Sequence, residues 1–312
     1  MMRISDGAIE RLRVAAENPD LGGTRYRLMH KLGQGGMGTV YAVEDSVLAR
    51  QVALKVINLL DSGGELAERL LQEARVIARL EHPGIVPVHD VGTLPDGRVF
   101  YTMKLVQGRR LDDPETDLGL EPECLRTFLK ICEAVAFAHS HTIVHRDLKP
   151  SNIMIGPFGE VLVMDWGLAK VIGSASSTPS GVHSGGAVMG TPGFMAPEQA
   201  RGEGVSGPAA DIYSLGMILN FLLKSGSSAQ LTRRLNAVIR KAAAVDPAAR
   251  YASVEQLAFD VSQYLQGGTL LAYPEGITAR AWRWVVRNRA WILLIIAYLA
   301  MRILFILWRK FS

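Results

Sequence analysis

The segment VHRDLKPSNIMI, residues 144–155, places His, Arg, Asp, Lys and Asn between two apolar runs. So many polar groups beside core sequence require hydrogen bonds among themselves or a bound ligand. Asp147 could accept the proton of a hydroxyl nucleophile. Asn152 offers an amide oxygen, and Asp165 offers a carboxylate at the end of the next apolar run. Because hard oxygen donors suit Mg²⁺, these residues predict either a metal-assisted site or a polar loop that satisfies itself.

A glycine-rich turn, GQGGMG at residues 33–38, has the spacing GxGxxG. Glycine has no Cβ, so backbone N–H groups in such a turn can approach phosphate oxygens closely. The turn lies between two strand-like runs and not between a strand and a helix, which disfavours a dinucleotide-binding site. It is a candidate phosphate-binding loop, although ordinary hairpin turns show the same spacing.

Lys55 lies inside the apolar run VALKVIN, and Glu73 lies in a stretch with helical periodicity. The stripe that contains Glu73 also holds four apolar residues, Leu66, Leu70, Ile77 and Leu80. This spacing predicts that the carboxylate faces inward, where it is costly unless it is paired. Lys55 is a candidate partner, and the pair could present an ammonium group to phosphates. Taken singly, each residue has a simpler interpretation as an ordinary surface charge.

The elements that must position these residues change in type along the chain. Strand-like runs cover residues 26–57, 85–92 and 99–106, and two shorter ones lie near 153–155 and 161–164. Helical patterns cover 65–80 and then four later ranges, 121–142, 211–223, 231–246 and 253–268. A β-rich first third followed by a helical remainder predicts two unequal lobes.

The net charge of +4 is a property of the C-terminal tail. Residues 276–312 contain seven basic and no acidic residues, so residues 1–275 carry a formal net charge of −3. This distribution argues against a nucleic-acid-binding face on the main domain and for an anionic membrane surface near the tail. The two cysteines, Cys124 and Cys132, lack metal-ligand spacing and predict no disulfide framework.

The stretch AWILLIIAYLAMRILFILW, residues 290–308, has a single charged residue, Arg302. At about 1.5 Å per residue, a helix of this length spans roughly 28 Å, close to the hydrocarbon thickness of a bilayer. Trp291 and Trp308 lie near its two ends, where aromatic belts occur. The four arginines between 280 and 289 predict that the preceding domain is cytoplasmic. A buried core helix or a hairpin packed on the domain is the alternative.

The order of these motifs resembles that of the Hanks-type serine/threonine protein kinases, particularly the bacterial membrane-anchored ones. The matching motifs are GQGGMGTVY, VALK, Glu73 in QEARVIARLEHPGIV, HRDLKPSN, DWG, GTPGFMAPE, DIYSLG and DPAARY. They occur in order between residues 26 and 265. The resemblance implies an α+β fold with a small β-rich N-lobe and a larger helical C-lobe, followed here by a single transmembrane helix.

The expected boundaries follow from the motifs and the tail composition. They are an N-terminal extension at 1–25, the N-lobe at 26–103, the hinge and C-lobe at 104–268, a basic juxtamembrane segment at 269–289, the transmembrane helix at 290–308 and a short tail at 309–312.

The resemblance also implies a role for each candidate residue. Lys55, paired with Glu73, would hold the α- and β-phosphates of ATP. Asp147 would orient and deprotonate the acceptor hydroxyl, and Lys149 would neutralise the transferred phosphoryl group. Asn152 and Asp165 would hold Mg²⁺, with Mn²⁺ as an alternative. The expected ATP-binding residues are Leu32, Gly33, Gly35, Gly38, Val40, Ala53, Lys55, the gatekeeper Met103, and Lys104 and Val106 in the hinge.

Other residues of the same motifs have implied structural or regulatory roles. Glu198 would pair with Arg250, and Asp211 would brace the catalytic loop. Arg146 would receive a phosphate from the activation segment. That segment contains the expected sites of autophosphorylation, Ser174, Ser176, Ser177, Thr178, Ser180 and Ser184, as well as Thr191. Its Ser- and Gly-rich composition alone would indicate only a flexible linker.

The sequence therefore predicts transfer of the γ-phosphoryl group of ATP to Ser or Thr hydroxyls of proteins in membrane-associated signalling. Lipid contact through the C-terminal helix, and a homodimer that phosphorylates itself in trans, are the further partners expected. A membrane-anchored pseudokinase scaffold that binds ATP is the alternative. Two departures from the family pattern stand out: Trp166 replaces the usual Phe, and only a short stretch at 224–230 separates two C-lobe helices.

Overall fold

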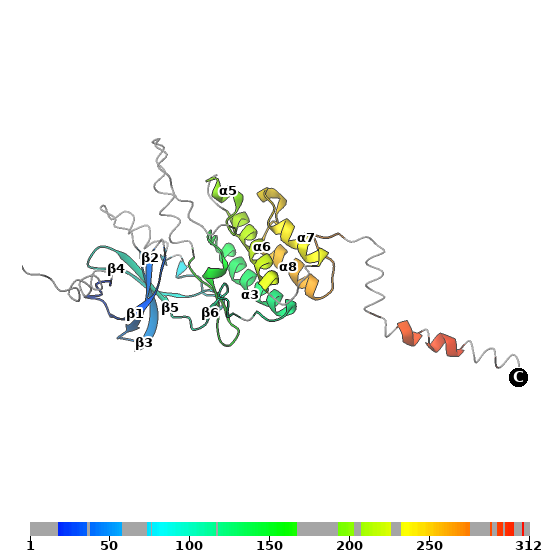
Figure 1. Ribbon diagram of the computed structural model, residues 1–312, viewed down its shortest axis with the longest axis horizontal. Coiled ribbons are helices and arrows are strands. Elements are labelled where there is room, and N and C mark those ends of the chain that lie inside the picture. Colours follow the sequence, from blue (N-terminus) through cyan, green and yellow to red (C-terminus); the bar gives the residue numbers. More distant parts are fainter. Residues whose placement is uncertain are drawn as a thin grey trace, which may run out of the picture.

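The chain folds into two lobes joined by one extended segment (Figure 1). The computed structural model describes residues 18–35, 38–57, 74–75, 77–116, 118–166, 193–202, 207–225, 232–274, 288, 292–295, 297–302 and 308. The smaller lobe is a sheet and the larger one is mostly helical, so the α+β, two-lobed fold expected from the motifs is confirmed.

A five-stranded antiparallel sheet forms the small lobe, with strand order β1-β2-β3-β5-β4. Its strands are β1 (Tyr26–Gly35), β2 (Gly38–Asp45), β3 (Arg50–Ile57), β4 (Val88–Thr93) and β5 (Val99–Lys104). All five strand-like runs between residues 26 and 106 therefore contain strands. The glycine-rich segment forms the end of β1 and the start of β2, where Gly35 pairs with Gly38 at the edge of the sheet.

Alternation along β3 decides which side chains face the large lobe. Val52, Leu54 and Val56 belong to an apolar cluster on the outer face of the sheet, together with Tyr41 and Phe100. The residues between them point to the opposite face because successive side chains of a strand alternate. Ala53 and Ile57 accordingly belong to the core cluster that continues into the large lobe, and Lys55 lies between them on the same face.

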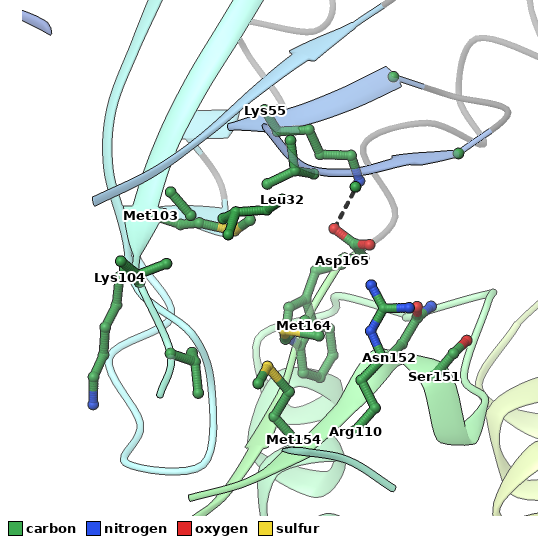
Figure 2. A pocket seen from close by; sticks show the side chains of 18 of the residues that line it. Leu32, Lys55, Met103, Lys104, Arg110, Ser151, Asn152, Met154, Met164 and Asp165 are labelled. Carbon is green, nitrogen blue, oxygen red and sulfur yellow. Dashed lines mark hydrogen bonds and ion pairs between the residues drawn. The ribbon is translucent and has the colours of Figure 1, made fainter. Parts of the chain in front are cut away.

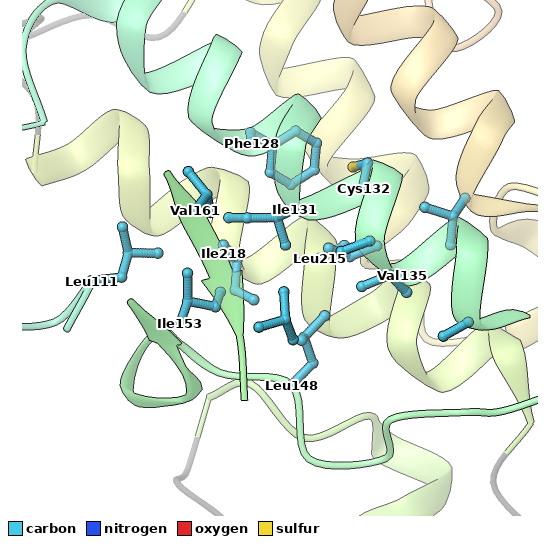
Figure 3. Packing of buried hydrophobic residues seen from close by; sticks show 14 of the residues in the cluster. Leu111, Phe128, Ile131, Cys132, Val135, Leu148, Ile153, Val161, Leu215 and Ile218 are labelled. Atoms are coloured by element: carbon cyan, nitrogen blue, oxygen red, sulfur yellow. The ribbon is translucent and has the colours of Figure 1, made fainter. Parts of the chain in front are cut away.

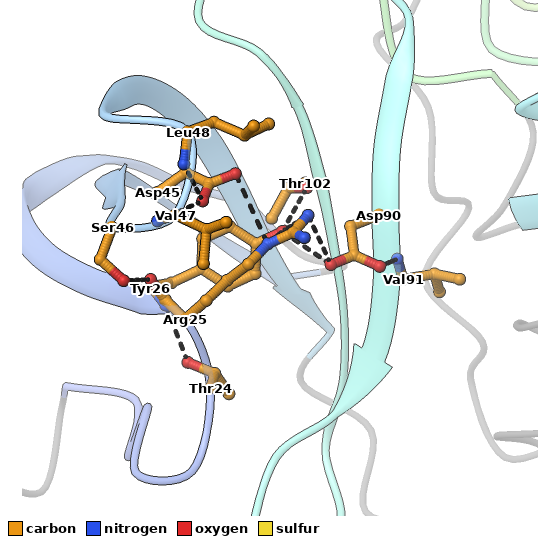
Figure 4. A network of polar contacts seen from close by, with 10 residues as sticks. All are labelled: Thr24, Arg25, Tyr26, Asp45, Ser46, Val47, Leu48, Asp90, Val91 and Thr102. Atoms are coloured by element: carbon orange, nitrogen blue, oxygen red, sulfur yellow. Dashed lines mark hydrogen bonds and ion pairs between the residues drawn. The ribbon is translucent and has the colours of Figure 1, made fainter.

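A polar network fixes the start of β1 on the sheet (Figure 4). The Arg25 guanidinium lies 3.1 Å from Asp90 Oδ2 and 3.5 Å from Asp45 Oδ2. The Tyr26 hydroxyl donates to Asp90 Oδ2 at 2.7 Å, and the same hydroxyl lies 3.3 Å from Thr102 Oγ1. These contacts join β1 to β4 and β5, which are not its neighbours in the sheet, and thus stiffen the small lobe.

The large lobe is built on helix α3 (Glu121–Ser140), whose apolar stripe is completely covered. Cys124, Phe128, Ile131 and Val135 recur at helical spacing and are all buried. Figure 3 shows Phe128, Ile131 and Val135 of this stripe near Ile153 and Val161 of two short strands and near Leu215 and Ile218 of a neighbouring helix. Both cysteines are buried free thiols, as the absence of a disulfide pattern predicts.

The remaining elements of the large lobe surround α3. A small sheet, in the order β6-β7-β8, contains β6 (Arg109–Arg110), β7 (Ile153–Ile155) and β8 (Val161–Val163). The helical elements are η1 (Pro150–Asn152), α5 (Pro197–Ala200), α6 (Pro208–Ser225), α7 (Arg233–Ala242), η2 (Pro247–Ala249) and α8 (Val254–Leu265). They confirm the helical patterns at 211–223, 231–246 and 253–268, with ends that differ by a few residues.

The C-terminal stretch is described only in part. Within the part of the chain that the structure describes, no helix is long and apolar enough to cross a membrane. Residues 292–295 and 297–302 are helical and mostly exposed, and the rest of the expected span lies outside the described residues except for Trp308. A transmembrane helix over 290–308 is therefore not found and stays a prediction.

One buried ion pair connects α5 to the segment that follows η2 in the large lobe. The Arg250 side chain is 0% exposed and forms two 2.7 Å hydrogen bonds to the carboxylate of Glu198. Arg250 also donates to the carbonyl oxygens of Ala209 and Ala244, so the guanidinium is well satisfied. The expected Glu198–Arg250 pair is confirmed. Hydrogen bonding from Arg250 holds the pKa of the Glu198 carboxyl below its usual value.

Replacing Arg250 by Met should lower the free energy of unfolding by about 3–5 kcal/mol, because Glu198 then loses its buried partner. Urea denaturation followed by circular dichroism measures the change. Arg109→Gln is the matched control, since Arg109 pairs with Glu115 in an exposed ion pair worth less than about 1 kcal/mol. Equal losses in the two variants would contradict the importance of the buried pair.

Candidate functional site

A cavity of about 500 Å³ lies between the two lobes (Figure 2). Its walls come from the glycine-rich turn, from β3 and β5, from the segment after β5, and from the loops beside β7 and β8. All ten residues expected to bind ATP line it: Leu32, Gly33, Gly35, Gly38, Val40, Ala53, Lys55, Met103, Lys104 and Val106. The fold thus brings together residues that lie more than seventy positions apart in the sequence.

One end of the cavity is apolar. Leu32, Val40 and Ala53 line it from the small lobe, and Met154 and Met164 line it from the large lobe. Thioether side chains adapt to irregular surfaces and contact aromatic rings favourably, so this end suits a flat aromatic ring. The side chain of Lys104 points away from the cavity in Figure 2, which leaves only its backbone to contribute there.

The other end of the cavity holds an ion pair between the lobes. Lys55 Nζ lies 2.7 Å from Asp165 Oδ1, and the Tyr101 hydroxyl lies 3.5 Å from the same oxygen. Burial opposes the charge of Asp165, but the ammonium of Lys55 outweighs it and holds the pKa of the carboxyl below its usual value. Burial likewise opposes the charge of Lys55, and Tyr101 and Asp165 outweigh that effect, so its pKa lies above the usual value.

Glu73, the partner expected for Lys55, lies outside the described residues. Among the residues that the structure describes, Asp165 is the carboxylate in contact with Lys55. The pair Lys55–Glu73 therefore stays a prediction. The ammonium group of Lys55 contacts Asp165 between the two lobes. A phosphate chain in the cavity could replace the Asp165 carboxylate as its partner.

The catalytic-loop residues form a second charged group on the floor of the cavity. Lys149 Nζ lies 3.0 Å from Asp147 Oδ2. Asn152 Nδ2 donates to the backbone oxygen of Asp147 at 2.8 Å, in the orientation assigned to the amide. This hydrogen bond uses the nitrogen of the side chain, so the amide oxygen of Asn152 is the atom left for a metal ion.

Asp211 braces the catalytic loop through hydrogen bonds to its backbone, as expected. Its Oδ1 accepts from the backbone N–H of Arg146, and its Oδ2 accepts from the backbone N–H of His145, both at 2.8 Å. The His139 ring also contacts Oδ2 at 2.8 Å. Arg146 has a φ of 65°, a left-handed conformation that costs a non-glycine residue about 1–3 kcal/mol. The buried carboxylate of Asp211 therefore supports a strained turn just before Asp147.

Trp166 fixes the backbone beside Asp165. Its side chain is buried, its Nε1 donates to the Val163 carbonyl at 3.2 Å, and its ring lies 4.8 Å from that of His145. Asp165 itself has a φ of 57°, so it is, after Arg146, a second residue of the site with a left-handed backbone conformation. This conformation sets the direction of its carboxylate. The large aromatic ring after Asp165 is packed in the core that joins the two lobes.

The donor set fits a metal ion that keeps several non-protein ligands. In the described residues, no group of three or more His, Cys, Asp and Glu side chains could hold a metal on its own. Mg²⁺ is usually bound by one or two carboxylates together with water and substrate phosphates. Asp165 and the amide oxygen of Asn152 are consistent with such a site, which would need a phosphate-bearing ligand to be complete.

Several lining residues were not among the sequence candidates. They are Gln34, Ile57, Tyr101, Gly108, Arg110, Ser151, Met154 and Met164. Alternation along β3 from Ala53 and Lys55 would have identified Ile57. The expected activation-segment residues, Ser174, Ser176, Ser177, Thr178, Ser180, Ser184 and Thr191, lie outside the described residues.

Comparison with known proteins identifies the family. Residues 26–258 match the protein kinase domain. Serine/threonine-protein kinase PknD of Chlamydia felis is 37% identical over 294 residues, which cover 78% of this chain and 31% of that protein. PknD of Protochlamydia amoebophila is 34% identical over 300 residues, with 78% and 30% covered. The chain thus spans about a third of the length of these curated relatives.

Solved structures give the same result. The crystal structure of the Mycobacterium tuberculosis PknI kinase domain matches with a TM-score of 0.60 and 26% identity, over 78% of this chain and 96% of that domain. The family is one whose members use ATP and a divalent metal ion. The resemblance to the Hanks-type kinases is confirmed, and the chain belongs to the protein kinase domain family.

Proposed function

We propose that this chain is an active serine/threonine protein kinase that transfers the γ-phosphoryl group of ATP, with Mg²⁺, to protein hydroxyls. The observation that carries the proposal is the convergence of two charged pairs, Lys55–Asp165 and Lys149–Asp147, at one end of a cavity whose other end is apolar. The printed names of the PknD relatives support Ser/Thr as the acceptor class.

Each part of the cavity has a role in this reaction. The apolar end binds the adenine ring, and the glycine-rich turn covers the phosphates. Lys55 leaves Asp165 to bind phosphate oxygens, which have a higher negative charge. Asn152 and Asp165 would hold Mg²⁺, and the bound ion would supply positive charge that neutralises the phosphates.

Asp147 and Lys149 act on the acceptor side. The Asp147 carboxylate orients the Ser or Thr hydroxyl and takes its proton as the hydroxyl oxygen bonds to the γ-phosphorus. The bond between that phosphorus and the β–γ bridging oxygen breaks, and ADP leaves with the bonding electron pair. Lys149 is close enough to Asp147 to neutralise the phosphoryl oxygens during this exchange.

A phosphate on the activation segment would add negative charge near the loop that contains Arg146. We include autophosphorylation among Ser174, Ser176, Ser177, Thr178, Ser180 and Ser184 in the proposal, with Arg146 as the docking cation. The support is the Ser-rich composition of the segment and the position of Arg146 directly before Asp147. Transfer in trans between two copies is the expected route.

The test is transfer of label from γ-labelled ATP, with Mg²⁺, to the protein itself and to a mixed Ser/Thr peptide set. Asp147→Asn should reduce the rate by about 10²–10⁴-fold, because it removes the base that takes the proton. Arg98→Gln is the control, since Arg98 pairs with Asp96 in a surface turn of the small lobe. ATP binding by the wild type without any transfer would favour the scaffold alternative. Digestion of the labelled wild type then shows whether residues 171–191 carry the label.

Membrane association is a further part of the proposal. It rests on the apolar stretch 290–308 and on the arginines between 280 and 289 that precede it. In that arrangement the kinase domain is cytoplasmic and the chain crosses the cell membrane once.

Fractionation of expressing cells tests this arrangement. The full chain should remain in the membrane pellet after a carbonate wash, and a chain that ends at residue 274 should move to the supernatant, because it lacks the apolar stretch. A full chain that is released by the carbonate wash would contradict a membrane-spanning segment.

A further inference from the structure

Arg110 differs from the other cations at the charged end of the cavity. Lys55 and Lys149, which also line it, each contact a carboxylate. Within the described ranges, no hydrogen bond or ion pair engages the guanidinium of Arg110, and its side chain is exposed while it lines the cavity. Figure 2 shows that side chain rising from β6 beside Met154, with its guanidinium directed toward Asn152.

The local strand pairing explains why Arg110 faces the cavity and Arg109 does not. Arg110 pairs with Met154 of β7, and Arg109 pairs with Ile155. Neighbouring side chains of a strand point to opposite faces. Arg109 accordingly turns outward, where it forms an ion pair with Glu115 at 3.1 Å and donates to the Glu115 backbone oxygen at 2.6 Å. One arginine of the pair is neutralised within the lobe, and the described residues offer the other no counter-charge.

An exposed arginine commonly needs no partner, since water solvates it. The position of Arg110 argues for more, because Lys55 and Lys149 each have a carboxylate partner within the cavity, whereas the described residues offer Arg110 none. A cation that lines a cavity without a counter-charge attracts an anionic ligand to that place. The guanidinium also has a planar fork of donors that matches a carboxylate in two hydrogen bonds.

Two anions could meet Arg110, namely the phosphates of ATP and an acidic side chain of the protein substrate. Lys55 and the glycine-rich turn already serve the phosphates from the small lobe. Arg110 belongs to the large lobe and is exposed at the rim of the cavity, on the side that carries Asp147, Lys149 and Ser151. An acceptor segment must approach Asp147 from the open side, so its neighbouring residues pass this rim.

We propose that Arg110 is a specificity-determining residue, which selects protein segments that carry Asp or Glu close to the acceptor Ser or Thr. This inference rests on the proposed kinase function and names its substrate class. The carboxylate would form a charge-assisted, bidentate pair with the guanidinium. Such an interaction changes kcat/KM by about tenfold to hundredfold.

The experiment uses the full chain and peptides that share one acceptor Ser and carry Glu, Gln or Lys at each flanking position in turn. Both phosphoryl transfer and the binding of fluorescently labelled peptides are measured. The wild type should prefer Glu at one or two positions by about tenfold to hundredfold. Arg110→Gln should abolish this preference, and Arg110→Glu should reverse it toward Lys, with the KM for ATP changed by less than about threefold.

Arg109→Gln is the matched control, because it removes the adjacent cation, which is already paired outside the cavity. It should keep the wild-type preference for Glu. A preference that survives in Arg110→Gln would overturn the inference. So would a rise in the KM for ATP that is equal for every peptide, since this result would assign Arg110 to the nucleotide.

The binding measurement separates this inference from the proposed function. Wild-type protein that binds the Glu peptides selectively but transfers no phosphate would support the role of Arg110 and contradict kinase activity. Transfer that proceeds equally well to Glu, Gln and Lys peptides would support kinase activity and contradict the role of Arg110.

Discussion

The ion pair between Lys55 and Asp165 joins the two lobes at the catalytic end of the cavity. The Lys55 side chain is largely buried and that of Asp165 is partly buried, and a charge removed from water is tolerated best when it is paired. The pair therefore sets how β3 of the small lobe faces the segment after β8 of the large lobe. A ligand can also separate the pair, because its anionic groups can compete for Lys55 while a metal ion bound to it competes for Asp165.

Buried groups of the large lobe hold Asp165, its member of this pair, in place. Asp165 and Arg146 both have left-handed backbone conformations, and each is supported by neighbouring buried groups. Trp166 packs beside Asp165 and donates to the backbone, while the Asp211 carboxylate accepts the N–H of Arg146. Strain concentrated at two functional residues and supported from a rigid core is the pattern expected of a preorganised site.

Much of this arrangement can be predicted from the sequence because local patterns fix it. Alternation in VALKVIN makes β3 a strand and places Lys55 on the inner face, and the stripe of α3 follows from apolar residues three and four positions apart. The contact of Lys55 with Asp165 could not be derived in this way, because 110 positions separate them and the pattern offered Glu73 as the candidate partner of Lys55. Nor could the orientation of Arg110, since a strand of two residues has no periodicity of its own. The apolar stretch 290–308 is a property of composition, and composition alone does not place it in a membrane.

The central claim is that Asp165 exchanges Lys55 for a metal ion when ATP binds. Calorimetric titration of ATP into the wild type and Asp165→Asn, with Mg²⁺ and with a chelator in its place, tests this claim most directly. The account predicts that Mg²⁺ tightens ATP binding to the wild type by at least about tenfold and has little effect on Asp165→Asn, which lacks the carboxylate. The same Mg²⁺ dependence in both proteins would contradict it.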